Sequence, residues 1–409
     1  MKLITTTALA LLASASPAVA QKAPAPAPAQ GAAAAQPKIT PSKGALKAIV
    51  DLQDTVNKND FANVPAKVAA ANAVATTKED KYLVGQLQLK AALAAKDNAA
   101  TASAIDTVVG SGYLPAAKNA ELYMSLGSSL YNSKQYPQAQ VAFQKAAALD
   151  PANSEAPSLL GEALLAQGQK AEAAAAFQRA IRASAAGGQK PNEQLLKRAV
   201  GVAYDANSPA AVDLSRQWVT AYPGPDSWRN SIAIYRNLNH PDIEGTLDLL
   251  RLMQVTGAMT QSEDYTLFAR AAAEQNNYNE AQAVLDAGVA AKLVNPASAD
   301  VKDLVVGLKA KPKATAADLA SATKSAVNGT ALLRIGDRYY AMGDYAKAVE
   351  LYRMAMGKPG VDTAVANLHI GMALARAGDK AGATTAPNAV TGPRADIAKY
   401  WLTYVNQRG

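Results

Sequence analysis

The sequence contains no cysteine and only two histidines among its 409 residues. Without cysteine, the chain can form neither a disulfide framework nor a cysteine-ligated zinc site, so its stability has to come from packing. Aromatic residues make up only 6%, although hydrophobic residues reach 49%. Much of the apolar content is therefore alanine, which favours closely packed helices over a bulky sheet core.

Motifs that carry catalysis are missing as well. The chain has no GxxxxGK[ST], GxGxxG, GxSxG or HExxH pattern, so nucleotide, hydrolase and zinc-protease sites are unsupported. Ser321 to Lys324 matches S-x-x-K but lacks the companion motifs of that family. His240 and His369 have no local acidic partners at metal-ligand spacing, and a structural role is the better interpretation for both. We predict no enzyme activity, no cofactor and no metal site.

The first 20 residues, MKLITTTALALLASASPAVA, have the layout of a secretory signal peptide. Lys2 supplies the positive charge, Ala8–Leu12 the apolar core, and Ala18-Val19-Ala20 the cleavage pattern. We therefore expect the mature chain to begin at Gln21 and to be periplasmic. No later segment reaches the roughly 18 apolar residues of a membrane helix, so no transmembrane segment is predicted.

Charge is positive but scattered. The net charge is +8, and removal of Lys2 with the leader would leave 8 − 1 = +7. Such a charge can favour acidic partners or anionic surfaces. The densest group, Lys309, Lys311 and Lys313, surrounds Pro312 and is interpreted as a solvated loop. We predict no nucleic-acid partner.

A Pro/Ala-rich segment at 21–42 is predicted to be a disordered spacer, because proline stiffens the chain toward an extended form. From about Gly44 onward, apolar residues recur at three- and four-residue steps between short polar breaks. This periodicity predicts helix after helix.

Five residues recur with the same identity 34 positions later. The two sets are Gly127, Leu130, Ala139, Phe143 and Ala146, then Gly161, Leu164, Ala173, Phe177 and Ala180. Small residues recur as faithfully as large ones because paired antiparallel helices must approach closely. A 34-residue unit of two such helices resembles the tetratricopeptide repeat. The resemblance implies an all-α solenoid of antiparallel helix pairs, a right-handed superhelix.

Further copies of the pattern start near Ser262 and Gly329, and weaker ones lie between and around them. The predicted organisation beyond the spacer is 43–119 degenerate N-terminal helix pairs, 120–294 a repeat array, 295–328 a degenerate repeat or a hinge, and 329–409 C-terminal repeats with a capping helix.

In tetratricopeptide repeats, defined positions of the first helix line a concave, partner-binding face. The resemblance places nine candidate partner-binding residues on that face, and they are Glu121, Met124, Ser128, Tyr131, Glu155, Glu162, Arg270, Asp337 and Tyr340. Their mixture of acidic and aromatic side chains suits an extended peptide with basic or apolar side chains.

Two functions remain open at this point. The first is a non-catalytic periplasmic scaffold that mediates protein–protein interaction in cell-envelope assembly or maintenance. The second is a glycan-associated binding protein of a cell-wall or exopolysaccharide pathway, because Trp218, Tyr222, Trp228 and Tyr235 are close in sequence. Packing at repeat junctions is the more common role of such aromatic residues.

Overall fold

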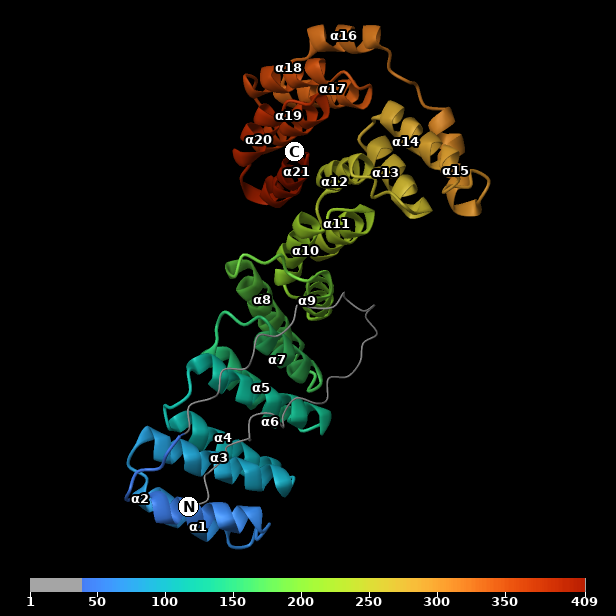
Figure 1. The fold of residues 1–409 in the computed structure, drawn as a ribbon. Helices are drawn as coiled ribbons and strands as arrows, with labels where there is room; N and C mark the ends of the chain where they lie inside the picture. The colour runs from blue at the N-terminus through green and yellow to red at the C-terminus, as the bar shows by residue number, and fades with distance from the viewer. Residues whose placement is uncertain (1–38, 409) are drawn as a thin grey trace, which may run out of the picture. The chain divides into compact units, whose positions relative to one another are not determined.

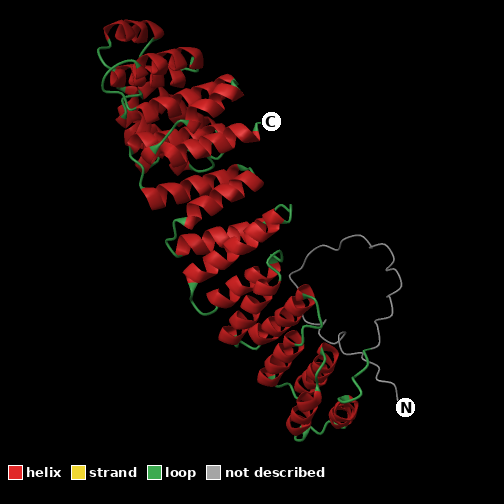
Figure 2. Ribbon diagram, turned by 90° about the vertical axis from the view of Figure 1, so that its left-hand side faces the viewer, coloured by secondary structure: helices red, strands yellow, loops and turns green. Residues whose placement is uncertain are grey.

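The computed structural model describes residues 39–408, and every regular element among them is a helix (Figure 2). The predicted all-α class is therefore confirmed. The predicted signal peptide and the spacer residues up to 38 lie outside the described residues.

The chain divides into two compact units at Lys190 and Pro191, called unit 1 and unit 2 below. This division falls inside the predicted 120–294 array. It directly follows the Gly187-Gly188 extension, where Gly188 has a φ of +69°. A glycine tolerates this left-handed conformation without strain.

Unit 1 consists of four consecutive helix pairs (Figure 1). The helices are α1 (Leu46–Asn57), α2 (Val64–Val74), α3 (Lys78–Ala94), α4 (Asn98–Gly110), α5 (Ala116–Asn132), α6 (Tyr136–Leu149), α7 (Glu155–Leu165) and α8 (Lys170–Ala186). The turn inside each pair holds a residue with positive φ, and these are Asn59, Lys96, Lys134 and Gly168. Each turn falls at a polar break that the sequence predicts.

Unit 1 begins earlier than the spacer prediction allows. The Ser42 backbone N–H donates to Asp80 Oδ1 at 2.8 Å, and the Ser42 hydroxyl donates to Asp80 Oδ2 at 2.8 Å. Ile39 packs on the first apolar core, and Pro41 is buried. Residues 39–42 are therefore tied to α3, because Asp80 satisfies their polar groups.

Glycines set the distance between paired helices. A Cβ atom on Gly127 would lie 2.5 Å from the ring of Phe143, and one on Gly161 would lie 2.7 Å from the ring of Phe177. Both rings are 1% exposed. No side chain fits between helix and ring at these distances, so the small residues are packing constraints, as the repeat pattern predicts.

Unit 2 holds the remaining helices. They are α9 (Glu193–Asp205), α10 (Ala210–Ala221), α11 (Pro225–Asn239), α12 (Ile243–Val255), α13 (Ser262–Glu274), α14 (Tyr278–Ala290), α15 (Ala299–Lys309), α16 (Ala316–Ser325), α17 (Gly329–Ala341), α18 (Tyr345–Met356), α19 (Thr363–Ala377), α20 (Lys380–Asn388), the 3-10 helix η2 (Gly392–Arg394) and α21 (Ala395–Gln407).

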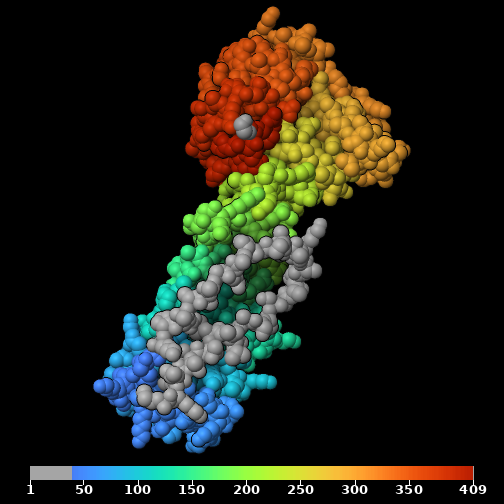
Figure 3. All heavy atoms as spheres, viewed as in Figure 1, coloured from blue at the N-terminus to red at the C-terminus, as the bar shows by residue number. Residues whose placement is uncertain are grey.

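The last helix of unit 2 returns to the beginning of that unit. Helix α21 packs against α10, α12 and α19, and the red C-terminal atoms lie directly against the yellow-green ones (Figure 3). Tyr400 and Trp401 on α21 are 0% exposed. The Tyr400 hydroxyl donates to the Ser231 carbonyl at 3.1 Å, and the Trp401 indole N–H donates to the Asp248 carbonyl at 3.3 Å. The predicted capping helix is thus part of the core of unit 2.

Residues 295–328 lie inside unit 2 and carry two helices. Helix α15 packs against α13 and α14, whereas α16 packs against α17. Each of the two helices thus packs on a different neighbour. Whether the segment acts as a hinge stays a prediction.

Candidate functional site

The predicted binding residues of unit 1 lie on successive first helices, α5 and α7. Glu121 and Glu155 are exposed. Met124, Ser128, Tyr131 and Glu162 are half-buried. Glu121 accepts a 2.7 Å ion pair from Lys118, with both side chains more than half exposed. Surface pairs of this kind contribute little to stability, so the carboxylate remains available to a partner.

A pair of tyrosines recurs in both units in two different environments. Tyr131 contacts Tyr136 edge to face, with ring centroids 5.3 Å apart. Tyr340 contacts Tyr345 in the same way at 5.4 Å. Tyr131 is half-buried, whereas Tyr340 is only 7% exposed. The repeat therefore places both tyrosines equivalently, and the surroundings decide which one reaches solvent.

Two predicted binding residues of unit 2 make contacts with charged side chains of the same unit, and of these Tyr340 is buried and Asp337 half-buried. The Tyr340 ring lies beneath the Arg251 guanidinium, 5.1 Å from its centroid. Asp337 Oδ1 accepts the Tyr352 hydroxyl at 2.8 Å and lies 2.9 Å from His369 Nδ1. Tyr340 is thus largely covered by side chains of the same unit, whereas the Asp337 side chain keeps 17% exposure. Whether these two residues face a partner stays a prediction.

Arg270 stands apart from this cluster. It is exposed on α13, and its guanidinium donates to the Asp300 carbonyl of α15 at 2.8 Å. Its contact joins neighbouring helices of unit 2.

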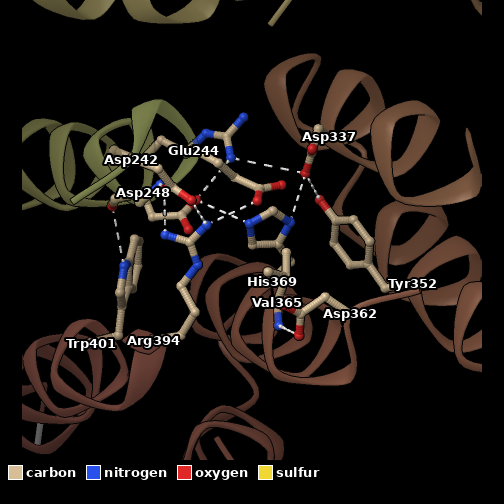
Figure 4. Close-up of polar contacts among 12 residues, drawn as sticks. Asp242, Glu244, Asp248, Asp337, Tyr352, Asp362, Val365, His369, Arg394 and Trp401 are labelled. Atoms are coloured by element: carbon tan, nitrogen blue, oxygen red, sulfur yellow. Dashed lines mark hydrogen bonds and ion pairs between the residues drawn. The ribbon is translucent and has the colours of Figure 1, made fainter. Parts of the chain in front are cut away.

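A buried ionic network occupies the centre of unit 2 (Figure 4). His369 on α19 is 1% exposed, and its two ring nitrogens face two carboxylates. Nε2 lies 3.0 Å from Asp248 Oδ1 on α12, and Nδ1 lies 2.9 Å from Asp337 Oδ1 on α17. One imidazole thus bridges three helices. This supports the structural role expected for His369.

Arg251 is the second buried cation of the network and is 2% exposed. Its guanidinium forms a bidentate pair with Glu280 on α14, with both N–O distances at 2.8 Å. It also contacts Asp248 at 3.3 Å and Asp337 at 3.9 Å. Planar, two-point pairing of this kind is the strongest geometry for an arginine and a carboxylate.

Arg394 extends the network toward the surface. It contacts Asp242 Oδ1 at 2.6 Å and Glu244 Oε2 at 3.0 Å, joining η2 to the start of α12 (Figure 4). A Cβ atom on Gly245 would collide with the Arg394 guanidinium. Glycine at 245 is therefore required for this approach.

Burial and charge shift the pKa values of the network in opposite directions. Burial alone would raise the pKa of Asp337, but His369 and Arg251 lower it to about 2. Burial alone would lower the pKa of His369, but Asp248 and Asp337 raise it well above 6.5. Burial raises the pKa of Glu244. The network therefore holds ionised carboxylates against protonated cations.

The sequence analysis missed this network because its members are far apart in the chain. Asp248 and His369 are separated by 369 − 248 = 121 positions. One local signal was available. Asp248 and Arg251 interrupt the otherwise apolar stretch LDLLRLMQV of α12, and charges inside an apolar run are rarely buried without partners.

The aromatic residues proposed as a stacking patch are packing residues. Trp218, Trp228 and Tyr235 are 6%, 3% and 4% exposed. The Trp218 indole N–H donates to Glu193 at 3.1 Å, and the half-buried Tyr222 donates its hydroxyl to the Pro191 carbonyl at 3.0 Å. The glycan-stacking surface expected as the alternative is therefore not formed by these rings.

Unit 1 has a groove of about 270 Å³ that is lined by residues of α4, α5 and α6. Leu126, Leu130 and Ala142 supply apolar lining, and the rim residue Val141 is 50% exposed. One end carries Asp106, which pairs with Lys145 at 2.6 Å. The groove lies on the second-helix side of unit 1, away from the predicted first-helix face.

Within residues 39–408, no group of histidine and acidic side chains is arranged to hold a metal ion. In the same range, no helix has the length and apolar character needed to cross a membrane.

Stacked antiparallel helix pairs, spaced by buried glycine–aromatic contacts, define a helical-repeat solenoid. A family model described as "Tetratricopeptide repeat" matches residues 124–188 and 333–390. The chain therefore contains segments that match tetratricopeptide repeats, one in each unit. Such repeats mediate protein–protein interactions, and proteins built from them are generally non-catalytic.

Among solved structures, the chain is similar to a tetratricopeptide repeat protein from Parabacteroides merdae ATCC 43184. The identity is 13%, the TM-score is 0.28, and the match covers 70% of this chain and 98% of that one. It is also similar to the TPR domain of P58(IPK), with 11% identity, a TM-score of 0.22, and coverage of 89% and 97%. No curated protein matches the chain.

Proposed function

We propose that this protein is a periplasmic, non-catalytic scaffold that binds a protein partner on the first-helix face of unit 1. Its role is in cell-envelope assembly or maintenance. The repeat class supports protein binding, and the signal-peptide pattern at residues 1–20 supports export.

The contrast between the two units carries the proposal. In unit 2, Tyr340 is only 7% exposed beneath Arg251, and Asp337 is 17% exposed and contacts His369 of the same unit. In unit 1, the residues one would expect on that face, such as Glu121, Glu155 and Tyr131, are exposed or half-buried. The proposed partner-binding face is therefore that of unit 1. In unit 2, the equivalent side chains contact helices of the same unit.

The exposed chemistry of unit 1 defines the kind of partner. Glu121 and Glu155 present negative charge one repeat apart, and Met124 and Tyr131 present partly exposed apolar surface beside them. An extended segment with basic side chains and interspersed apolar ones complements this face.

Site-specific photocrosslinking in intact cells tests the face. A photoreactive residue at Ser128 or at Glu155 is expected to capture the same protein, because both positions belong to one surface. The control is Gln144, which is exposed on the second helix α6. The double change Glu121→Lys and Glu155→Lys is expected to reduce that capture by up to about thirtyfold, since two lost charge pairs at up to about 1 kcal/mol each make up to about 2 kcal/mol. Equal capture from Gln144 would contradict the proposed face.

Export is tested separately from binding. Cell fractionation followed by mass spectrometry of the N-terminus is expected to find the chain in the periplasm, beginning at Gln21. An intact Met1 on the periplasmic form, or a cytoplasmic chain, would refute the localisation and leave the binding face unaffected.

A further inference from the structure

His369 faces a carboxylate oxygen with each of its ring nitrogens, at 3.0 Å and 2.9 Å. A neutral imidazole has one N–H donor and one lone pair. In a neutral ring, the nitrogen without a proton would lie within 3.0 Å of a carboxylate oxygen, and two electron-rich atoms at that distance repel each other. Both contacts are attractive only when both nitrogens carry a proton. The geometry therefore selects the imidazolium form.

We propose that protonated His369 is a pH-sensitive clamp that holds α12 and α17 together across α19, so that unit 2 loosens as the solution becomes alkaline. The clamp works through Asp248 on α12 and Asp337 on α17. Asp248 Oδ2 and both ring nitrogens of His369 are buried and make no hydrogen bond among the described residues, so the clamp acts through opposite charge at 3.0 Å and 2.9 Å. The carboxylate of Asp248 consequently depends on the cations that face Oδ1.

The other groups around the ring do not replace its charge. On α12, Arg251 lies 3.3 Å from Asp248, and Glu244 adds negative charge. On α14, Glu280 takes two of the donors of Arg251. On α18, Tyr352 packs its ring edge to face at 5.4 Å from His369 and donates to Asp337. On η2, Arg394 is engaged by Asp242 and Glu244.

Counting these charges shows what loss of the proton does. Arg251, Arg394 and His369 supply three positive charges, and Asp242, Glu244, Asp248, Glu280 and Asp337 supply five negative ones. A neutral His369 raises the excess of negative charge from two to three. At least one buried carboxylate then faces a lone pair, and a buried charge without its partner is strongly destabilising.

The direction of the pH dependence follows from linkage. The pKa of His369 is raised well above 6.5 by Asp248 and Asp337. In the folded chain the ring keeps its proton, whereas in an opened chain it loses the proton near its ordinary pKa. The stabilisation is fully present below pH 6.5 and is lost as the pH rises from there through the folded pKa.

Nuclear magnetic resonance of the full chain tests the protonation state directly. The chain has only two histidines, so ¹⁵N-histidine labelling yields two rings, and the variant His240→Asn assigns them. His240 has a φ of 45°, a conformation that asparagine tolerates. The expected result at pH 7.5 is a His369 ring with both nitrogens protonated. A neutral tautomer at that pH would overturn the proposal.

Thiol labelling tests the loosening, because the chain has no cysteine of its own. Ala366→Cys on α19 reports on unit 2, and Ala146→Cys on α6 is the matched control in unit 1. Both alanines are 0% exposed. The ratio of their labelling rates cancels the ordinary pH dependence of a thiol. It is expected to rise by up to about tenfold per pH unit above pH 6.5.

The variant His369→Gln removes the titrating group and keeps a hydrogen-bond donor. In that background the labelling ratio is expected to be higher at pH 6 and to be independent of pH up to 8.5. A ratio in the parent chain that stays constant from pH 5.5 to 8.5 would overturn the clamp. If the glutamine variant does not fold, the protonation state from nuclear magnetic resonance and the labelling ratio of the chain with His369 still decide whether the clamp exists.

Discussion

At the scale of single residues, a glycine and the aromatic ring sixteen positions later set the distance between paired helices. The pairs are Gly127 with Phe143, Gly161 with Phe177, and Gly336 with Tyr352. Only the third ring carries a hydroxyl, and that hydroxyl donates to Asp337 at 2.8 Å. Tyr352 stands where the other two repeats have phenylalanine, and its hydroxyl connects this packing position to the ionic network of unit 2.

Replacing Gly336 with alanine is expected to destabilise unit 2 by about 1–3 kcal/mol, because the new Cβ would lie 2.5 Å from a buried ring. The control is Gly201→Ala in α9, where nothing lies within 4 Å of the added atom. That change is expected to stabilise by up to about 1 kcal/mol, because alanine is the better helix former. Equal effects of the two changes would contradict the contact.

Urea unfolding followed by tryptophan fluorescence measures these effects in unit 2 alone. The three tryptophans, Trp218, Trp228 and Trp401, all belong to that unit. Tryptophan fluorescence therefore does not report directly on unfolding of unit 1.

Tyr352→Phe removes one donor from Asp337 and leaves the ring in place. Hydrogen bonds to buried charged groups are worth about 1.5–3 kcal/mol, and a loss of that size is expected in the same unfolding assay. Phe143 and Phe177 show that the site tolerates a phenylalanine ring. Tyr204→Phe is the control, since its hydroxyl only accepts an exposed bond from Asn237, and a change below about 0.5 kcal/mol is expected there.

At the scale of elements, α12 and α21 organise unit 2. Helix α12 contributes Asp248 and Arg251 to the network. Helix α21 follows the last helix pair and packs against α10, α12 and α19. A terminal helix often caps a repeat array at its open end. Here it also reaches back to earlier helices and closes the unit.

Trp401→Ala is expected to destabilise unit 2 by about 3–5 kcal/mol, because the ring is 0% exposed and its removal leaves a cavity. The two remaining tryptophans report the transition. Lys399→Ala, on the exposed side of the same helix, is the control, and its ion pair with Asp396 is a surface pair. A cost for Trp401→Ala no larger than that for Lys399→Ala would show that α21 only frays at the end of the chain.

At the scale of the whole molecule, the two units contain the same repeat but differ in which of its residues are buried. Unit 1 leaves Glu121 and Glu155 exposed, whereas unit 2 buries Tyr340 against its own helices and leaves Arg270 exposed. Buried ion pairs are costly to assemble, and once assembled they are costly to break. Unit 2 therefore responds to pH through its core.

Acid is expected to weaken unit 2 through Asp337, whose pKa is lowered to about 2 from 3.8. A depressed carboxyl pKa stabilises the fold above pH 3.8, and that contribution is lost as the pH falls through 2. The shift corresponds to about 2 kcal/mol. Unfolding at pH 5, 3 and 2, followed by tryptophan fluorescence, measures it.

Asp337→Asn is the matched control for the acid effect. It lacks the titrating carboxyl, so its stability is expected to be lower at pH 5 and to fall less between pH 4 and 2. An identical fall in both proteins would assign the acid sensitivity to other carboxylates.

Local sequence predicted the helices, the turns and the spacing, because these depend on residues that are neighbours in the chain. The repeat of Gly127 and Phe143 at 161 and 177 identified the helix pair, and the polar breaks located turns such as those at Lys134 and Gly168. The same pattern placed Tyr131 and Tyr340 at equivalent positions, and the structure shows that they form equivalent tyrosine pairs.

Only the tertiary structure decided which of those equivalent positions is accessible. Tyr340 is buried and Asp337 is half-buried because Arg251 and His369 lie against them. Burial depends on how helices from distant parts of the chain come together, and a 34-residue period describes only the packing of neighbours. The sequence by itself therefore determined a solenoid of antiparallel helix pairs, and the return of α21 and the partners of α12 decided which repeat positions of unit 2 are buried.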